Sequence, residues 1–477
     1  MTKVRRALKF SIIATHLDSL LNLIAVIIIA RILTPDELGI FAIASSIVII
    51  ANTLKTFGVG NYIVKKVELN KNDIKSALGL NIIISVTLGL IVAFSAYPAQ
   101  AFYEKDDIGL LMLILTVPFF VSPYAANGIA LLTRDLKFDK IFRIGIITQI
   151  SNLIMTIVLV YLGFSYYALA ISMAVQSIIQ TFLIRVYSPA SMEWLPRFKE
   201  MKNIAKFGFY VTFSNLCNKM NMISPDLIIG KVGTPSMVAY YSRGLGLINY
   251  IHTTLAMGVM QVALPYFTNS KKDGTPIEDA YLKSTALING LLLPAFVIAS
   301  VISEPLVLFI FGDQWTESAG LVATLCFWAF FNNIHPLVSV LLIAEDKEKH
   351  IFIINLIFTI ITALTIFFVF PFGLNAIAQA MIVVSFVYFI TINVVLSIYM
   401  KFSTLKFIRS QIKNILLCVG CYVIATGITK IDLFIETSIL IQMLVFLLLM
   451  GITWLSIIFM IKHPLQQEFK KVFSGSH

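Results

Sequence analysis

The sequence predicts an all-α, polytopic membrane protein with about fourteen transmembrane helices. Of its 477 residues, 58% are hydrophobic and only 13% are charged, and the mean hydropathy is +0.89. This is too little charge to cover the surface of a soluble protein of this size. Apolar runs of about 20 residues recur along the whole chain, each long enough to cross the bilayer as a helix. A transmembrane barrel would show short alternating strands instead.

Each predicted span is an apolar run between charged or turn residues. Several runs are longer than a perpendicular helix needs, so we expect tilt or extension beyond the bilayer. The runs are 10–31, 40–64, 76–98, 108–132, 141–162, 165–187, 204–230, 237–266, 281–311, 318–344, 351–371, 373–400, 412–430 and 436–461.

Two segments about 200 residues apart resemble each other, which indicates an internal duplication. Residues 30–41 and 230–241 share a cation, a Thr-Pro pair and an aromatic residue at the same spacing. Further identities continue to residues 73 and 273. Many transporters contain such repeats, and an even number of spans per half returns the chain to its starting side. The sequence therefore predicts two parallel six-helix lobes followed by two C-terminal helices.

The duplication divides the chain into five predicted parts. These are an N-lobe (1–187), a cytoplasmic interfacial linker (188–206), a C-lobe (207–400), two further helices (401–461) and a cytoplasmic tail (462–477). Within the linker, Trp194, Leu195 and Phe198 stand beside basic residues. This composition is typical of a segment that lies at the membrane surface.

Lys and Arg concentrate in alternate connections, beginning with the amino-terminal residues. By the positive-inside rule, these connections and both termini are predicted to be cytoplasmic, with the Thr-Pro hairpins on the outer side. The first apolar run has no small-residue cleavage site, so it is predicted to be an uncleaved span. The net charge of +11 follows from the asymmetry of the connections and calls for no nucleic-acid partner.

The sequence contains no motif for nucleotide binding, metal binding or covalent catalysis. Cys418 and Cys421 form a C-x-x-C, but they lie inside an apolar run and are predicted to be small packing residues. No connection is long enough for a soluble domain. We therefore predict a protein that is not an enzyme and has no cofactor or metal.

Ionisable and polar residues inside the spans are the candidate site. A charged side chain costs at least about 2.5–3.5 kcal/mol at the centre of a membrane helix, so each should face the interior of the bundle. The candidate substrate-binding cations are Lys55, Lys219 and Arg243. The candidate polar or ion-coupling residues are Asp18, Asn22, Asn218, Asp226 and His252. Uncharged Gln149, Asn152, Gln176 and Gln180 extend this polar lining.

The cations predict what such a cavity would carry. A cationic centre favours a phosphate-bearing or otherwise anionic substrate. The alternative is structural: the same groups would pair between helices, for example Lys219 with Asp18, and only hold the bundle together. A proton or sodium ion bound at Asp18 or Asp226 would supply the driving force, and the sequence leaves the choice of ion open.

Three stretches of the sequence resemble motifs of the Wzx-type polysaccharide-export flippases. These are Ala30–Phe41, Leu132–Phe138 and Phe311–Trp315. The superfamily of these flippases also contains multidrug extruders and the lipid II flippase. The resemblance implies two six-helix lobes arranged in a V, as in the multidrug extruders, that work by alternating access.

The resemblance also implies the substrate and partners. The substrate would be an undecaprenyl-pyrophosphate-linked oligosaccharide moved to the outer leaflet of the cytoplasmic membrane, and basic cavity residues would meet the pyrophosphate. The partners would be membrane lipids and the polysaccharide polymerase or export machinery. Two alternatives remain. A cation-coupled drug extruder would need a more acidic cavity, and a membrane polymerase or ligase would need a long outer loop.

Overall fold

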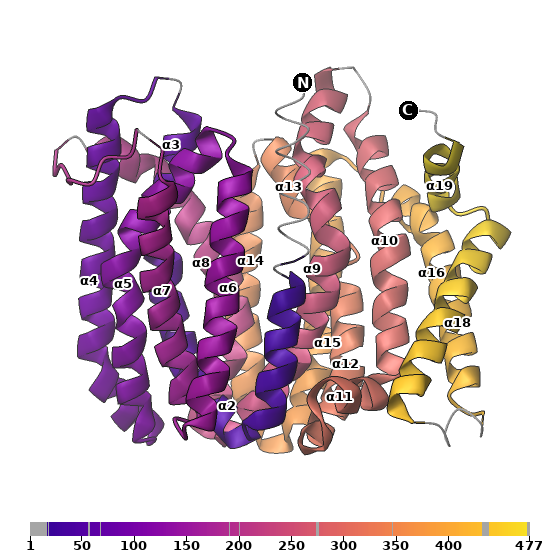
Figure 1. Ribbon diagram of the computed structural model, residues 1–477. Coiled ribbons are helices and arrows are strands. Elements are labelled where there is room, and N and C mark those ends of the chain that lie inside the picture. Colours follow the sequence, from indigo (N-terminus) through magenta and orange to yellow (C-terminus); the bar gives the residue numbers. More distant parts are fainter. Residues whose placement is uncertain are drawn as a thin grey trace. The chain divides into compact units, whose positions relative to one another are not determined.

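The computed structural model describes residues 17, 19–55, 58–66, 68–189, 191–199, 201–272, 276–345, 347–431 and 438–474 (Figure 1). Every regular element in these ranges is helical, and none of the described residues forms a strand. The predicted all-α fold class is confirmed. By its internal contacts the chain divides into two compact units, residues 1–239 and 240–477.

Most helices of the first unit are long and lie roughly parallel to one another (Figure 1). They are Ser19–Ile32, α2 (Pro35–Lys55), α3 (Val59–Lys65), α4 (Lys71–Tyr103), α5 (Asp107–Arg134), α6 (Phe138–Tyr161), α7 (Tyr167–Tyr187) and α8 (Lys202–Val232). Helix α5 is the central element, because it contacts α2, α3, α4, α6 and α7.

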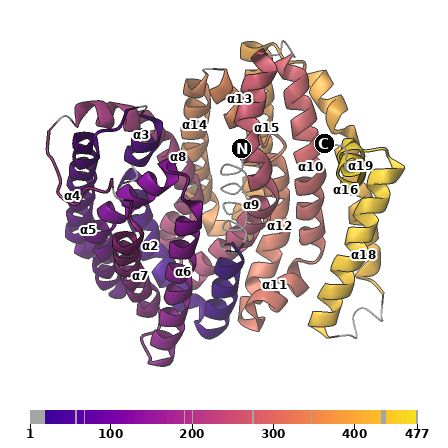
Figure 2. The same cartoon turned by 45° about the horizontal axis from the view of Figure 1, so that its top comes forward.

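The second unit begins within α9 (Pro235–Lys272). It continues with α10 (Ile277–Val301), α11 (Ser303–Phe311), α12 (Thr316–Asn332), α13 (Val338–Ala344), α14 (Glu348–Val369), α15 (Leu374–Met400), α16 (Thr404–Ile428), α18 (Ile439–Met460) and α19 (Pro464–Ser474). Figure 2 shows α16, α18 and α19 side by side, and contacts join α16 to α18 and α18 to α19. This unit boundary puts α8 with the first unit, although the sequence repeat assigns it to the second lobe.

Within the described residues, each predicted span coincides with a helix or a pair of helices, while residues 10–16 and 18 of the first span lie outside them. The protein is a multi-pass membrane protein. Ten helices of the described chain are long and apolar enough to cross a membrane. Helices α8 and α9 are not among them, because they carry many of the polar residues that the sequence analysis singled out. Ser19–Ile32 and α12 are not among them because their described lengths are short.

Three of the predicted spans each form two helices instead of one. The run 40–64 forms α2 and α3, with Gly58 between them at φ 65°, a left-handed conformation that glycine adopts readily. Arg134, at the end of α5, fixes α3 by donating to the carbonyls of Ile63, at 2.8 Å, and Lys66. The predicted spans 281–311 and 318–344 likewise form α10 with α11 and α12 with α13.

The two Thr-Pro segments contact each other inside the first unit. The Asp36 carboxylate accepts hydrogen bonds from the backbone N–H of Ser236 (3.2 Å) and from its hydroxyl (2.6 Å). Positions 36 and 236 are equivalent in the predicted repeat. Gly39 lies directly against the Pro235 backbone, where no side chain would fit. These contacts give the two segments a structural role.

Candidate functional site

Helices α2 and α8 run antiparallel and bring two of the predicted cations to a similar level along the helix pair. Ser46 on α2 donates to the Asp226 carboxylate on α8 at 3.0 Å. From that contact, Lys55 lies about 14 Å along α2 and Lys219 about 10 Å along α8, in the same direction, at 1.5 Å per residue. The sequence predicted both lysines as substrate-binding cations. In the structure they lie on neighbouring helices of one unit.

Lys55 is half-buried at the last turn of α2. Its ammonium donates to the Ser122 hydroxyl at 3.0 Å and lies 4.8 Å from the centre of the Phe119 ring. None of the ion pairs among the described residues includes Lys55. A helix C-terminus favours a cation because of the partial negative charge on its last carbonyls. Ser122 and Phe119 thus hold the ammonium in place, and no carboxylate of the described residues neutralises it.

Two prolines inside α5 are the sequence neighbours of the residues that Lys55 contacts. Pro118 and Pro123 lack the N–H that would close a helical hydrogen bond. Pro123 therefore leaves the carbonyl of Phe119 without its helical donor. Sequence reasoning missed Phe119 and Ser122. The Ser-Pro pair inside an apolar run was a usable signal, because a proline in a membrane helix exposes polar backbone at membrane depth.

The other predicted polar residues of the first unit have different surroundings. Lys219 is exposed, and Asp226 is held by Ser46. Asn22 is exposed and accepts a hydrogen bond from Gln149 at 2.6 Å. Asp18 lies outside the described residues, as does the side chain of Asn218. The suggested pair of Lys219 with Asp18 therefore stays a prediction.

In the second unit, Arg243 is part of an aromatic cluster. Its guanidinium lies 5.6 Å from the centre of the Trp315 ring, and Trp315 is fully buried. Tyr240 meets the same ring edge-on at 6.0 Å. The Phe311–Trp315 stretch thus supports the Arg243 side chain. His252, about two and a half turns further along α9, is half-buried.

An apolar groove lies in the second unit between α9, α10, α11 and α18. Its volume is about 470 Å³, and apolar side chains form almost all of its lining. Tyr250 on α9, Leu291 on α10 and Leu447 on α18 are among these residues. A groove with this lining suits a hydrocarbon chain and offers no partner for a charge.

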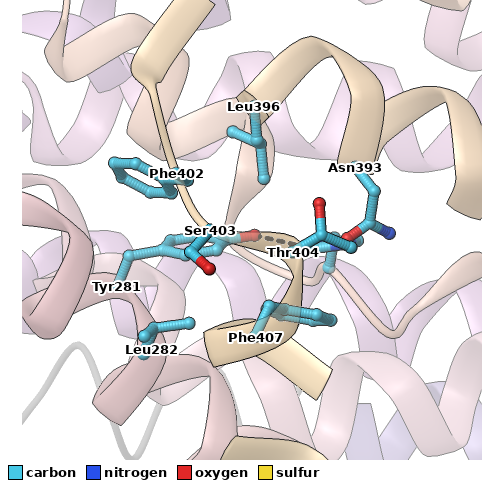
Figure 3. Close-up of a pocket in the computed structure, with 9 residues that line it drawn as sticks. Tyr281, Leu282, Asn393, Leu396, Phe402, Ser403, Thr404 and Phe407 are labelled. Carbon is cyan, nitrogen blue, oxygen red and sulfur yellow. Dashed lines mark hydrogen bonds between the residues drawn. The ribbon is translucent and has the colours of Figure 1, made fainter. Parts of the chain in front are cut away.

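A second cavity in the same unit is much smaller (Figure 3). It lies beside the buried hydrogen bond of 2.9 Å between the Tyr281 hydroxyl and His335 Nδ1, and Asn393 also lines it. Its volume of about 10 Å³ corresponds to roughly one water molecule. It is therefore too small for a sugar or a phosphate group.

Comparison with known proteins identifies the family of the chain. Residues 28–320 match the family model described as "Polysaccharide biosynthesis protein". The chain belongs to this family. It is 21% identical to the lipopolysaccharide biosynthesis protein WzxC of Escherichia coli, over 71% of this chain and 69% of that protein. It is 20% identical to the teichuronic acid biosynthesis protein TuaB of Bacillus subtilis, over 88% of each.

Solved structures show the same fold in transporters. The lipid II flippase MurJ, in an inward closed conformation, matches with a TM-score of 0.73 at 17% identity, over 94% of this chain and 98% of that one. An inward-facing multidrug transporter of the MATE family matches with a TM-score of 0.67 at 14% identity, over 84% and 95%. The polysaccharide biosynthesis family member described here therefore has a MurJ- and MATE-like fold, as the sequence predicted.

Proposed function

We propose that this protein is a flippase that moves an undecaprenyl-pyrophosphate-linked oligosaccharide across the cytoplasmic membrane by alternating access. The observation that carries the proposal is the ammonium of Lys55, held at membrane depth by Ser122 and Phe119 without an ion-pair partner among the described residues. A cation in such a setting favours an anionic ligand. Lys219, at a similar depth on α8, adds a second positive charge.

The physical barrier explains why such a site is needed. Each bare hydroxyl moved into hydrocarbon costs about 4–8 kcal/mol on a cyclohexane scale. A head group of a few sugars would thus face a barrier of tens of kcal/mol, and the phosphates would raise it further. A hydrated path lined by polar side chains lowers this barrier. The isoprenoid tail can stay in an apolar environment, for which the groove beside α18 is suited.

We propose the following orientation and membrane for the transport step. Both termini lie in the cytoplasm, the membrane is the cytoplasmic membrane, and no bond of the substrate is made or broken. Asp226, held by Ser46 midway along α2, is the candidate group for coupling to a proton or sodium gradient. Polymerase and export proteins are the partners that would use the product.

Substitution of the two lysines tests the proposal in cells that depend on this protein. We expect Lys55→Ala and Lys219→Ala each to lower surface polysaccharide, and the double variant to abolish it, at unchanged protein level. Lys430→Ala removes an exposed cation outside the site and serves as control. Normal export by the double variant would contradict the proposal. If the alanine variants lower the amount of protein, Lys55→Arg replaces them in the same assay. This variant keeps the charge and should restore export.

A further inference from the structure

Three side-chain amides from three helices meet in the first unit. Gln149 on α6 donates through Nε2 to Oδ1 of Asn22, on the helix Ser19–Ile32, at 2.6 Å. Gln176 on α7 donates through Nε2 to Oε1 of Gln149 at 3.4 Å. Gln149 and Gln176 lie near the middle of their helices. We refer to Asn22, Gln149 and Gln176 as the amide triad.

The amide triad is not covered by protein. Asn22 is exposed, and the other two side chains are partly exposed. An amide that faces hydrocarbon without partners is costly, so polar side chains at this depth face water or a polar ligand. One turn further along α6, the Oδ1 atom of Asn152 is buried and has no hydrogen-bond partner among the described residues. Asn152 thus leaves one buried acceptor unused, one turn of α6 from Gln149.

The remaining capacity of the triad has a clear chemical character. A primary amide has two N–H donors and two acceptor lone pairs, and Gln149 uses one of each within the triad. A sugar hydroxyl both donates and accepts, so it matches what remains. A phosphate only accepts hydrogen bonds, and its charge is better met by a cation. The triad thus differs in kind from the Lys55 site.

The two sites are close enough to serve one ligand. Thr181 on α7 donates to the carbonyl of Val121 on α5 at 3.3 Å. Val121 is the neighbour of Ser122, which holds the Lys55 ammonium at 3.0 Å. Thr181 lies about 8 Å along α7 from Gln176. A ligand with a phosphate and a carbohydrate next to each other would reach both sites.

We propose that the amide triad binds hydroxyl groups of the carbohydrate part of the substrate, while Lys55 binds its phosphate part. This inference rests on the proposed function and assigns the recognition of the sugar to residues of the first unit. It predicts that loss of an amide weakens binding only when the ligand carries sugars.

Binding to the full-length protein in lipid nanodiscs tests the inference. The probes are undecaprenyl diphosphate and undecaprenyl diphosphate carrying a neutral disaccharide or tetrasaccharide, each competing with a fluorescent undecaprenyl diphosphate. Gln149→Met and Gln176→Met remove one amide each at similar size. Ser172→Ala is the matched control, because it removes the hydrogen bond of 2.7 Å between Thr156 and Ser172, which joins the same two helices elsewhere.

We expect Gln149→Met and Gln176→Met to weaken binding of the sugar-bearing probes about fivefold, the effect of one hydrogen bond. Binding of undecaprenyl diphosphate itself and the behaviour of Ser172→Ala should match the wild type. Equal binding of sugar-bearing and sugar-free probes by the wild type would overturn this inference and leave the proposed function intact. Failure of the wild type to bind any of the probes would overturn both. Equal losses for all probes in the Gln variants would also overturn the inference, since they would show a structural role.

Discussion

The close contact between the two Thr-Pro segments explains why position 39 holds a glycine. A side chain at this position would collide with the Pro235 backbone, which cannot move away without displacing α9. We expect Gly39→Ala to lower the free energy of unfolding by about 1–3 kcal/mol, the usual cost of overpacking. Thermal unfolding of the purified protein measures this. Gly246→Ala is the control, because nothing lies within 4 Å of its added carbon. Equal stability of the two variants would contradict the account.

His463 gives the protein a pH dependence of stability. The Leu465 N–H donates to His463 Nδ1 at 3.2 Å, so Nε2 carries the proton and donates to Asn414 Oδ1 at 2.8 Å. Burial, together with the charge of Lys413, lowers the pKa of His463 to about 4. The unfolded chain, with a pKa near 6.5, therefore binds the proton more readily, and stability is lost as pH falls from about 6.5 towards 4.

The size of this effect can be measured by comparison with a variant. We expect the wild type to lose roughly 2 kcal/mol more than His463→Gln between pH 7.5 and 4.5. Glutamine keeps a donor and an acceptor at the position but does not titrate. Thermal unfolding at a series of pH values gives the difference. Parallel curves for the two proteins would rule out His463 as the titrating group.

Residue types could be predicted from the sequence, but their partners could not. The sequence identified Lys55, Lys219 and Asp226 because charged groups inside apolar runs are costly and therefore conspicuous. It did not identify Ser122, because the Ser-Pro pair there indicates a break in a helix but not which side chain the serine meets, and its partner Lys55 lies 67 positions away. It also treated Gln149 and Gln176 as general lining, since periodicity does not show which helices are neighbours.

At the level of elements, the linker after α7 is fastened to the ends of neighbouring helices. The Arg197 N–H donates to the carbonyl of Lys75 at 3.0 Å, and Met192 is buried in an apolar cluster at this end of α4 and α5. Trp194 stacks on Tyr124 of α5 with their ring centres 6.0 Å apart. The backbone is thus held against the unit while some large side chains point away from it.

Two of these side chains test the predicted contact of the linker with the membrane surface. Leu195 is 73% exposed and Phe198 is 56% exposed. We expect an environment-sensitive dye on Leu195→Cys to report an apolar surrounding in vesicles. The same dye on exposed Ser191→Cys should report water. The native cysteines are buried and should not react. A water-like signal at position 195 would show that the linker does not reach the lipid.

At the scale of the whole molecule, hydropathy predicted the helices, and the repeat identified the two Thr-Pro segments as equivalent. Their contact with each other was not predicted. The breaks between α2 and α3, α10 and α11, and α12 and α13 were not predicted. Hydropathy reports whether a segment is apolar, and an apolar run can continue through a change of backbone direction. The break at Gly58 matters most, because it lies close to Lys55 in the last described turn of α2.

The central claim is that Lys55 and Lys219 bind the pyrophosphate of a glycolipid while the protein moves it across the membrane. Its most direct test is transport by the purified protein in vesicles, using fluorescent undecaprenyl diphosphate linked to an oligosaccharide and a reagent that detects the probe only in the outer leaflet. We predict that the wild type exposes the probe many times faster than empty vesicles do, and that Lys55→Ala with Lys219→Ala removes this acceleration. Equal rates for the wild type and the double variant would contradict the account.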